Sequence, residues 1–119
     1  MNLSNKKILV TGSAGFTPWN FSNRDMFYYV YILHSLKDNK LYAGYSADLR
    51  KRLEDHQKGK VTSTKHRRPL KLIYFEGCTE QDDATKREKY FKTHYGKMFL
   101  KKRLKSYFTG QVDINNSEE

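Results

Sequence analysis

A chain of 119 residues is long enough for one domain with a modest core. Its 30% charged and 14% aromatic residues favour a folded domain over a disordered chain, and no apolar stretch approaches the roughly 20 residues of a membrane span. A single cysteine excludes a disulfide framework and a cysteine zinc cluster, so we expect a reducing, cytoplasmic setting. Because no stretch is long and apolar enough to span a membrane, we expect no membrane partner.

The net charge of +10 is concentrated in the middle of the chain. Residues 26–108 carry 20 lysines and arginines against 9 aspartates and glutamates, whereas residues 109–119 are acidic. A compact basic domain of this size commonly binds a polyanion, and nucleic acid is the first candidate. Solubility alone is the competing explanation.

The first 25 residues differ in composition from the rest of the chain. The run Ile8–Val10, followed by Gly12 and Gly15, is similar to the opening strand and glycine turn of the extended short-chain dehydrogenase/epimerase family. The third glycine of that motif falls on Pro18, and no series of βαβ units comes after it, so we expect no NAD site. Residues 1–25 are predicted to be an N-terminal extension outside the fold, and an arm that contacts nucleic acid is the alternative.

Two strands and a helix are predicted after Met26. Residues 27–33 are dense in β-branched and aromatic side chains, residues 37–40 are typical of a turn, and residues 41–45 form a second strand, so the pattern predicts an antiparallel hairpin. Ser46 is expected to cap a helix that runs through Lys58 and ends at Gly59. A basic loop over residues 60–70 comes next.

The second half of the chain adds one strand and two helices. Residues 71–76 are predicted to be the third strand, and residues 79–82 resemble a capping box that opens a helix to Tyr95, stopped by Gly96. Residues 98–108 are predicted to be the last helix, with a flexible acidic tail over residues 109–119. The expected fold is α/β (α+β), with order β-β-α-β-α-α and helices flanking a small three-stranded antiparallel or mixed sheet.

Three polar side chains lie on the core side of the predicted helices. Glu88 shares a helix face with Ala84 and Phe91, where a carboxylate is costly unless it is paired or bound to a cation. For Glu88 considered alone, an ion pair with a nearby arginine is the favoured explanation. Arg52 and His56 are four residues apart on one helix face that borders the core, and a solvated basic helix is the alternative.

Two tyrosines lie on the facing strands of the predicted hairpin. If Asp38 and Asn39 formed a two-residue turn, Tyr31 would oppose Ser46. Tyr31 and Tyr42 would then point to the same side of the sheet, because side chains alternate along a strand. Packing alone is the competing explanation for such a pair.

Two short motifs stand eleven positions apart, Tyr29-Val30-Tyr31 and Tyr42-Ala43-Gly44. Further residues come after them in a fixed order: Ser46, Asp48-Leu49, Arg52-Leu53, His56, Arg68-Pro69-Leu70, Asp83-Ala84 and Arg87-Glu88. In this order and spacing they resemble the GIY-YIG nuclease domain, particularly its small single-domain members related to the N-terminal domain of the excinuclease C subunit. Tyr29 stands where the family name has glycine and Ala43 where it has isoleucine, but neither change removes a side chain that the family uses in catalysis.

The resemblance implies a metal-dependent endonuclease that hydrolyses phosphodiester bonds. Glu88 would hold one Mg²⁺ or Mn²⁺ ion, which would polarise the scissile phosphate. Arg52 would stabilise charge on the phosphoryl oxygens. Tyr31 would help to activate the attacking water, and Tyr42 would position water or phosphate. His56 would assist proton transfer or orient Tyr31.

The resemblance also implies a nucleic-acid partner, with DNA ahead of RNA, in repair or recombination and within a larger repair complex. The side chains expected to run along the phosphate backbone are Lys65, His66, Arg67 and Arg68. A non-catalytic nucleic-acid-binding module on the same fold is the alternative. An NAD enzyme is a third hypothesis, against which Pro18 and the missing βαβ series argue. Joint retention of the two tyrosines, the arginine and the glutamate favours the endonuclease, because binding alone needs only a basic surface.

Overall fold

A computed structural model describes residues 26–110 of the protein. The predicted extension over residues 1–25, with its strand and glycine turn, lies outside the described residues, as do residues 111–119 of the predicted tail. The last helix includes Thr109, so the predicted start of the tail is one residue too early. Within residues 26–110, no helix is long and apolar enough to span a membrane.

A three-stranded sheet forms the centre of the fold. Its strands are β1 (Tyr28–Ser35), β2 (Leu41–Ser46) and β3 (Leu70–Cys78). The strand order is β2-β1-β3 and both pairs are antiparallel. The predicted α+β class is therefore confirmed, and the sheet is antiparallel rather than mixed.

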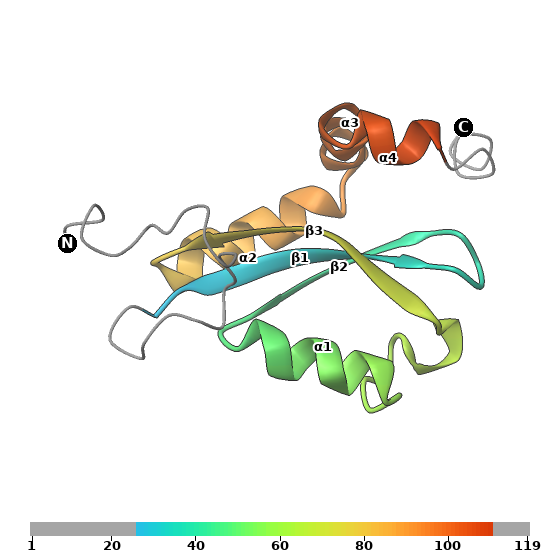
Figure 1. Ribbon diagram of the computed structural model, residues 1–119. Helices are drawn as coiled ribbons and strands as arrows, with labels where there is room; N and C mark the ends of the chain where they lie inside the picture. The colour runs from blue at the N-terminus through green and yellow to red at the C-terminus, as the bar shows by residue number, and fades with distance from the viewer. Residues whose placement is uncertain (1–25, 111–119) are drawn as a thin grey trace, which may run out of the picture.

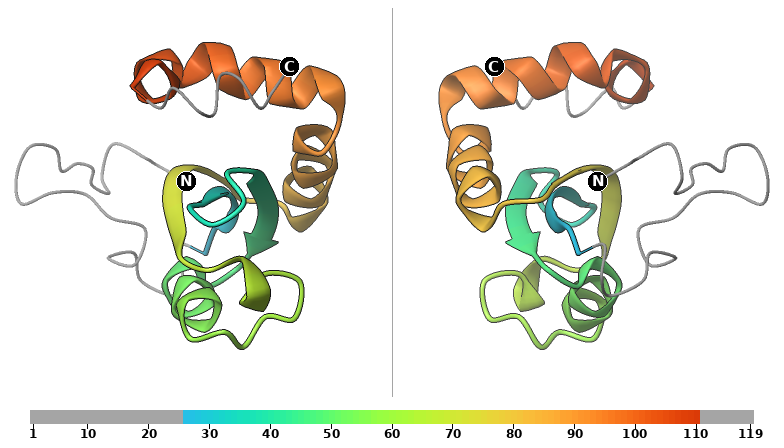
Figure 2. Two further views of the ribbon diagram at one scale, coloured as in Figure 1. Left: turned by 90° about the vertical axis from the view of Figure 1, so that its right-hand side faces the viewer. Right: turned by 90° about the vertical axis from the view of Figure 1, so that its left-hand side faces the viewer.

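Helices cover both faces of the sheet (Figure 1). The helix α1 (Leu49–Gln57) packs on one face and α2 (Gln81–Phe91) on the other. Beyond α2 lie α3 (His94–Arg103) and the short α4 (Lys105–Thr109), which Figure 2 shows running across the end of α2. A single 3-10 turn, η4 (Lys65–Arg67), lies in the basic loop before β3.

Alternation of side chains along β1 builds one core on each face of the sheet. Val30 and Ile32, each 1% exposed, pack with α2 and α3. Tyr31 and Leu33 point the other way, toward Leu49 of α1. Tyr31 therefore belongs to the α1 face, a placement that decides which residues it can meet.

The β1–β2 connection gives a different register from the predicted one. Tyr31 pairs with Gly44 instead of Ser46, because the loop is longer than a two-residue turn. Asn39 adopts a positive φ of 64°, which asparagine tolerates better than most residues. The shift of two positions preserves alternation, so Tyr31 and Tyr42 lie on the same face, as predicted.

The start of α1 differs from the prediction by two residues. Asp48, rather than Ser46, is the N-cap, and its carboxylate accepts a hydrogen bond from the Lys51 backbone N–H at 3.1 Å. Ser46 acts one step earlier, since its Oγ accepts from the Asp48 backbone N–H at 2.9 Å. The helix ends just before Gly59, whose φ is +80°, so this glycine terminates the helix as expected.

The predicted capping box at the start of α2 is wrong. The helix begins at Gln81, and the side chain of its N-cap, Glu80, makes no capping hydrogen bond. The Thr79 side chain therefore does not have the N-cap role that the sequence suggested.

The predicted helix end at Gly96 is also wrong. The chain leaves α2 after Phe91, and Thr93 caps α3 by accepting from the Gly96 backbone N–H at 3.1 Å. Gly96 lies inside α3, where an added Cβ would lie 2.7 Å from the Phe91 Cα. The glycine is needed because α3 crosses the end of α2 at backbone contact.

Candidate functional site

Four of the predicted site residues meet on the α1 face of the sheet. The Tyr31 hydroxyl oxygen lies 2.8 Å from His56 Nε2 and accepts a hydrogen bond from Arg52 Nε at 3.4 Å. The Tyr42 ring lies 6.4 Å from the Tyr31 ring and 5.3 Å from the His56 ring, between centroids. Two strands and α1 thus bring together residues that are far apart in sequence.

The hydrogen-bonded chain continues to Thr64, a residue that the sequence analysis missed. His56 Nδ1 lies 2.7 Å from Thr64 Oγ1, and both residues are 0% exposed. We assign the Tyr31 hydroxyl as the donor to His56 Nε2, and we place the imidazole N–H on Nδ1, where it donates to Thr64 Oγ1. In this assignment each of the three hydrogen bonds from Arg52 to Thr64 has one donor and one acceptor. The run of hydroxyl residues at 62–64 was the signal available in the sequence.

Burial sets the protonation states of Tyr31 and His56 in this hydrogen-bonded series. Burial raises the pKa of Tyr31 to about 12, against the lowering effect of the hydrogen bond from Arg52. Burial, together with the Arg52 charge, lowers the pKa of His56 to about 4. Tyr31 is therefore a neutral phenol at pH 7, and its oxygen serves to hold the Arg52 guanidinium.

Gly44 of the second motif makes room for the Tyr31 phenol. A Cβ at position 44 would lie 2.5 Å from Tyr31 Cζ, well inside van der Waals contact. The phenol of the central strand can therefore extend over β2, the edge strand. Glycine is needed at position 44 because a side chain there would overlap the Tyr31 ring, and not because the backbone turns.

Glu88 lies on α2, on the opposite face of the sheet from these four residues. It stands on α2 between Ala84 and Phe91, which are 0% and 2% exposed. Its own side chain is 20% exposed. Burial is the main cause of the raised pKa of Tyr31, and the Glu88 charge adds a smaller rise.

The ion pair of Glu88 differs from the expected one. Its partner is Lys92, with Nζ 3.2 Å from Oε2, instead of an arginine. Arg87 pairs with Glu76 at 3.1 Å and lies over the Phe91 ring, 4.6 Å from its centroid, so it is held on the other side of α2. Glu88 is thus balanced by one flexible, half-exposed lysine.

The fit of a metal ion can be judged from the available ligands. No group of three or more His, Cys, Asp or Glu side chains within residues 26–110 is placed to hold one. Mg²⁺ keeps several waters and is commonly bound by one or two carboxylates together with substrate phosphates. Glu88 fits such an ion, whereas a zinc or calcium site with only protein ligands does not fit.

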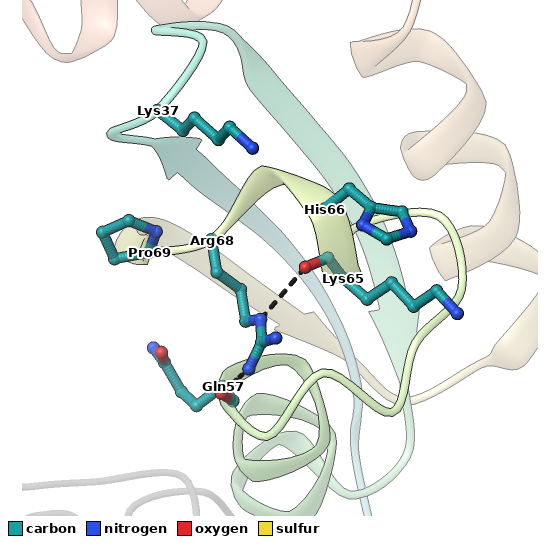
Figure 3. Close-up of a pocket in the computed structure, with 6 residues that line it drawn as sticks. All are labelled: Lys37, Gln57, Lys65, His66, Arg68 and Pro69. Carbon is teal, nitrogen blue, oxygen red and sulfur yellow. Dashed lines mark hydrogen bonds between the residues drawn. The ribbon is translucent and has the colours of Figure 1, made fainter.

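The four predicted phosphate-binding residues fall into two groups. Arg67 Nε lies 2.7 Å from Asp38 Oδ2, and against the raising effect of burial this hydrogen bond lowers the pKa of Asp38 to about 2. Arg68 donates to the carbonyl oxygens of Lys65 at 3.0 Å and Gln57 at 3.2 Å, as Figure 3 shows. Lys65 and His66 are exposed. The two arginines therefore hold the loop, and Lys65 and His66 remain the stronger candidates for phosphate contact.

A depression of about 440 Å³ lies among these basic side chains (Figure 3). Lys37 from the β1–β2 turn joins its lining, which no sequence pattern indicated. The full lining is Lys37, Gln57, Lys65, His66, Arg68 and Pro69. The absence of an acidic residue from this lining suits a phosphate group.

The sheet, the paired tyrosines, the arginine and the opposing glutamate define the class of the protein. Residues 27–103 match the GIY-YIG catalytic domain, and the chain belongs to this family.

Its curated relatives bear the name UPF0213. A UPF0213 protein of Pediococcus pentosaceus is 47% identical over 79 residues, which cover 63% of this chain and 82% of that protein. The UPF0213 protein YazA of Bacillus subtilis is 43% identical over 72 residues, covering 60% and 69%. The solution NMR structure of the UPF0213 protein BH0048 from Bacillus halodurans matches with 30% identity and a TM-score of 0.43, over 66% of this chain and 86% of that one.

Proposed function

We propose that this protein is a metal-dependent endonuclease that hydrolyses phosphodiester bonds in DNA. The observation that carries the proposal is the buried hydrogen-bonded series Arg52–Tyr31–His56–Thr64 on the α1 face of the sheet. Glu88 lies on α2, which packs on the opposite face, and its charge contributes, after burial, to the raised pKa of Tyr31. A binding module needs only exposed positive charge, whereas phosphoryl transfer needs a fixed cationic donor beside a metal ligand.

Each residue then has a role that fits its surroundings. Arg52 would contact the phosphoryl oxygens, and its planar guanidinium can make two contacts at once. Tyr31 has no exposed surface, so its part in activating water runs through Arg52 and His56, and it is a positioning residue. Tyr42 is partly exposed and would orient water or phosphate. Glu88 would hold Mg²⁺ or Mn²⁺, which when bound polarises the scissile phosphate.

The test is incubation of plasmid and branched DNA with the purified protein, with and without Mg²⁺, beside Glu88→Gln. We expect cleavage by the wild type only with the metal. Glu88→Gln should lose cleavage but keep its fold and most of its DNA affinity, because the amide keeps the shape of the side chain and removes its charge. Glu54→Gln is the matched control, since Glu54 lies on α1 in a surface ion pair with Arg50.

Two outcomes would contradict the proposal. Cleavage by Glu88→Gln at the wild-type rate would remove Glu88 from the metal site. Retained DNA binding without cleavage by the wild type under any of these conditions would leave a non-catalytic binding module.

We place the proposed activity in DNA repair or recombination, within a larger complex. The branched-DNA arm tests this assignment, because an enzyme of those processes should cleave branched DNA in preference to intact plasmid.

A further inference from the structure

The outward side of α3 carries several positive charges. Gly96 and Leu100 are buried against the rest of the fold, so the residues on the opposite side of this helix point outward. We call this side the outer face of α3, and its residues are His94, Tyr95, Lys97, Met98, Lys101 and Lys102. From His94 to Thr109 the chain has five lysines and arginines and no aspartate or glutamate. The positive charge of the outer face is therefore not neutralised within α3 and α4.

Lys97 is the cation of this face that local structure explains least. It stands in the first turn of α3, where the helix dipole disfavours positive charge, and four residues before Lys101, a spacing at which like charges repel. Lys101 and Lys102 instead lie in the last turn, where the dipole favours them. Lys97 is exposed, and within residues 26–110 it forms no ion pair with an acidic side chain. Its charge can therefore meet an external anion.

Lys97 is connected to the proposed metal ligand through Lys92. The side chains of Lys92 and Lys97 line one small depression, together with Leu41 of β2. Lys92 in turn forms the ion pair with Glu88, at 3.2 Å. The outer face of α3 therefore begins near β2, on the α2 side of the sheet.

The basic loop places a second group of cations near the same strand, on the other face. Ser63 Oγ of this loop lies 3.5 Å from the Tyr42 hydroxyl oxygen of β2, and Lys65 stands two residues further on. Figure 2 shows α3 and this loop on opposite faces of the sheet. Because β2 is an edge strand, a wide polyanion that lies along this edge can contact both groups of cations.

The composition of the outer face favours a phosphate backbone over a lipid surface. A helix that lies in a membrane interface buries a large apolar face. The apolar side of α3 already packs inside the protein through Leu100, and the outer face has only Tyr95 and Met98, 73% and 41% exposed, as apolar members. Lysines on flexible stems beside such residues suit phosphates and sugars of nucleic acid.

We propose that the outer face of α3 binds the phosphate backbone of the same DNA duplex that the basic loop binds, with the duplex lying along the β2 edge. The inference rests on the proposed nuclease function and deepens it by naming duplex DNA as the substrate class. A duplex presents two backbones, so it can meet cations on both faces of the sheet, whereas the one backbone of a single strand reaches one face.

Binding of a fluorescent DNA duplex over a salt series tests the inference, without divalent metal so that no cleavage interferes. Lys97→Ala should lower the slope of log affinity against log salt by about 0.9, since one phosphate contact is lost. Lys97→Ala combined with Lys65→Ala should lower it by about 1.8, because one duplex contacts both residues. Lys86→Ala is the matched control and should leave the slope unchanged, since Lys86 is exposed on α2 one turn after Asp82 and Asp83.

Two further measurements separate binding from folding and duplex from single strand. Lys97→Arg keeps the charge and should keep the slope, and circular dichroism should show the same helix content in both Lys97 variants. On single-stranded DNA of the same length, only one of the two single substitutions, Lys65→Ala or Lys97→Ala, should lower the slope. Equal decreases for both on the single strand would overturn the duplex assignment.

An unchanged slope on the duplex for Lys97→Ala would overturn the inference. If that variant instead lost binding to vesicles of phosphatidylcholine and phosphatidylserine, the outer face would be a membrane surface. The two proposals can fail separately. A lower slope without any cleavage by the wild type in Mg²⁺ would refute the nuclease and keep the DNA surface. Cleavage with an unchanged slope would do the reverse.

Discussion

Within residues 26–110, the Arg52 guanidinium donates a hydrogen bond to one oxygen, the Tyr31 hydroxyl. Arg52→Lys should therefore lose most activity although the charge is retained, because an ammonium group cannot make the planar two-point contact. Loss of one such transition-state donor typically lowers the rate by about 10²–10³. Single-turnover cleavage rates measure this effect.

Arg50→Lys is the control for the Arg52 prediction, since Arg50 lies on the same helix with a side chain 64% exposed. Equal rates for Arg52→Lys and the wild type would show that Arg52 is only a surface charge.

His56 should make the stability of the fold depend on pH. In the unfolded chain His56 becomes protonated below its ordinary pKa of 6.5. In the folded protein burial lowers the pKa of His56 to about 4. The unfolded state thus binds more protons between these values, so stability is full above pH 6.5 and falls as the pH drops to 4. The expected loss is about 3 kcal/mol, measured by urea unfolding at each pH.

His56→Gln isolates this histidine from the other titrating groups. The variant cannot titrate, so its stability should change less than that of the wild type between pH 6.5 and 4. An identical pH profile would mean that another group causes the loss.

At the scale of elements, Gly96 sets the junction of α2 and α3. Helix propensity alone would make Gly96→Ala stabilising by about 1 kcal/mol. The Cβ would instead overlap the backbone at the end of α2, and such overpacking typically costs about 1–3 kcal/mol. We expect a net loss of stability in urea unfolding, and a gain would show that the two helices can separate without cost.

Two substitutions in the basic loop should distinguish a residue that binds phosphate from one that holds the loop. Lys65→Ala should lower the slope of log affinity against log salt by about 0.9 on duplex DNA, since one phosphate contact is lost. Arg67→Ala should leave that slope unchanged, because Arg67 is engaged with Asp38. Binding titrations over a salt series measure both, and an equal decrease for Arg67→Ala would show that it exchanges Asp38 for phosphate.

The elements and the fold class could be predicted from the sequence because they depend on local patterns. The dense apolar run of β1 and the spacing of Leu49 and Leu53 are enough to define a strand and a helix. The alternation rule was also enough to place Tyr31 and Tyr42 on one face, despite the wrong register.

The features that could not be predicted depend on contacts between distant residues. The role of Gly96 arises from a neighbouring helix, and the engagement of Arg67 arises from an aspartate in another loop. Thr64 is eight residues from His56 in sequence, and no periodic pattern connects them. Single-sequence patterns carry no information about such pairs.

At the scale of the whole molecule, residues 26–110 supply a hydrophobic cluster on each face of the sheet. A variant without residues 1–25 should therefore unfold at the same urea concentration as the full chain, and the full chain should not bind NAD. Amide hydrogen exchange of the full chain tests this boundary. Strong protection over residues 8–16 would show that the extension packs on the domain and that the predicted boundary is wrong.

The division of the proposed site between the two faces of the sheet has a consequence for protein synthesis. The α1-face residues, from Tyr31 to Thr64, emerge from the ribosome before β3, and Glu88 emerges only after β3. The emerged part of the nascent chain thus exposes the arginine and both tyrosines before it exposes the proposed metal ligand. On the proposed function, the nascent enzyme becomes active only when α2 has docked on the second face of the sheet.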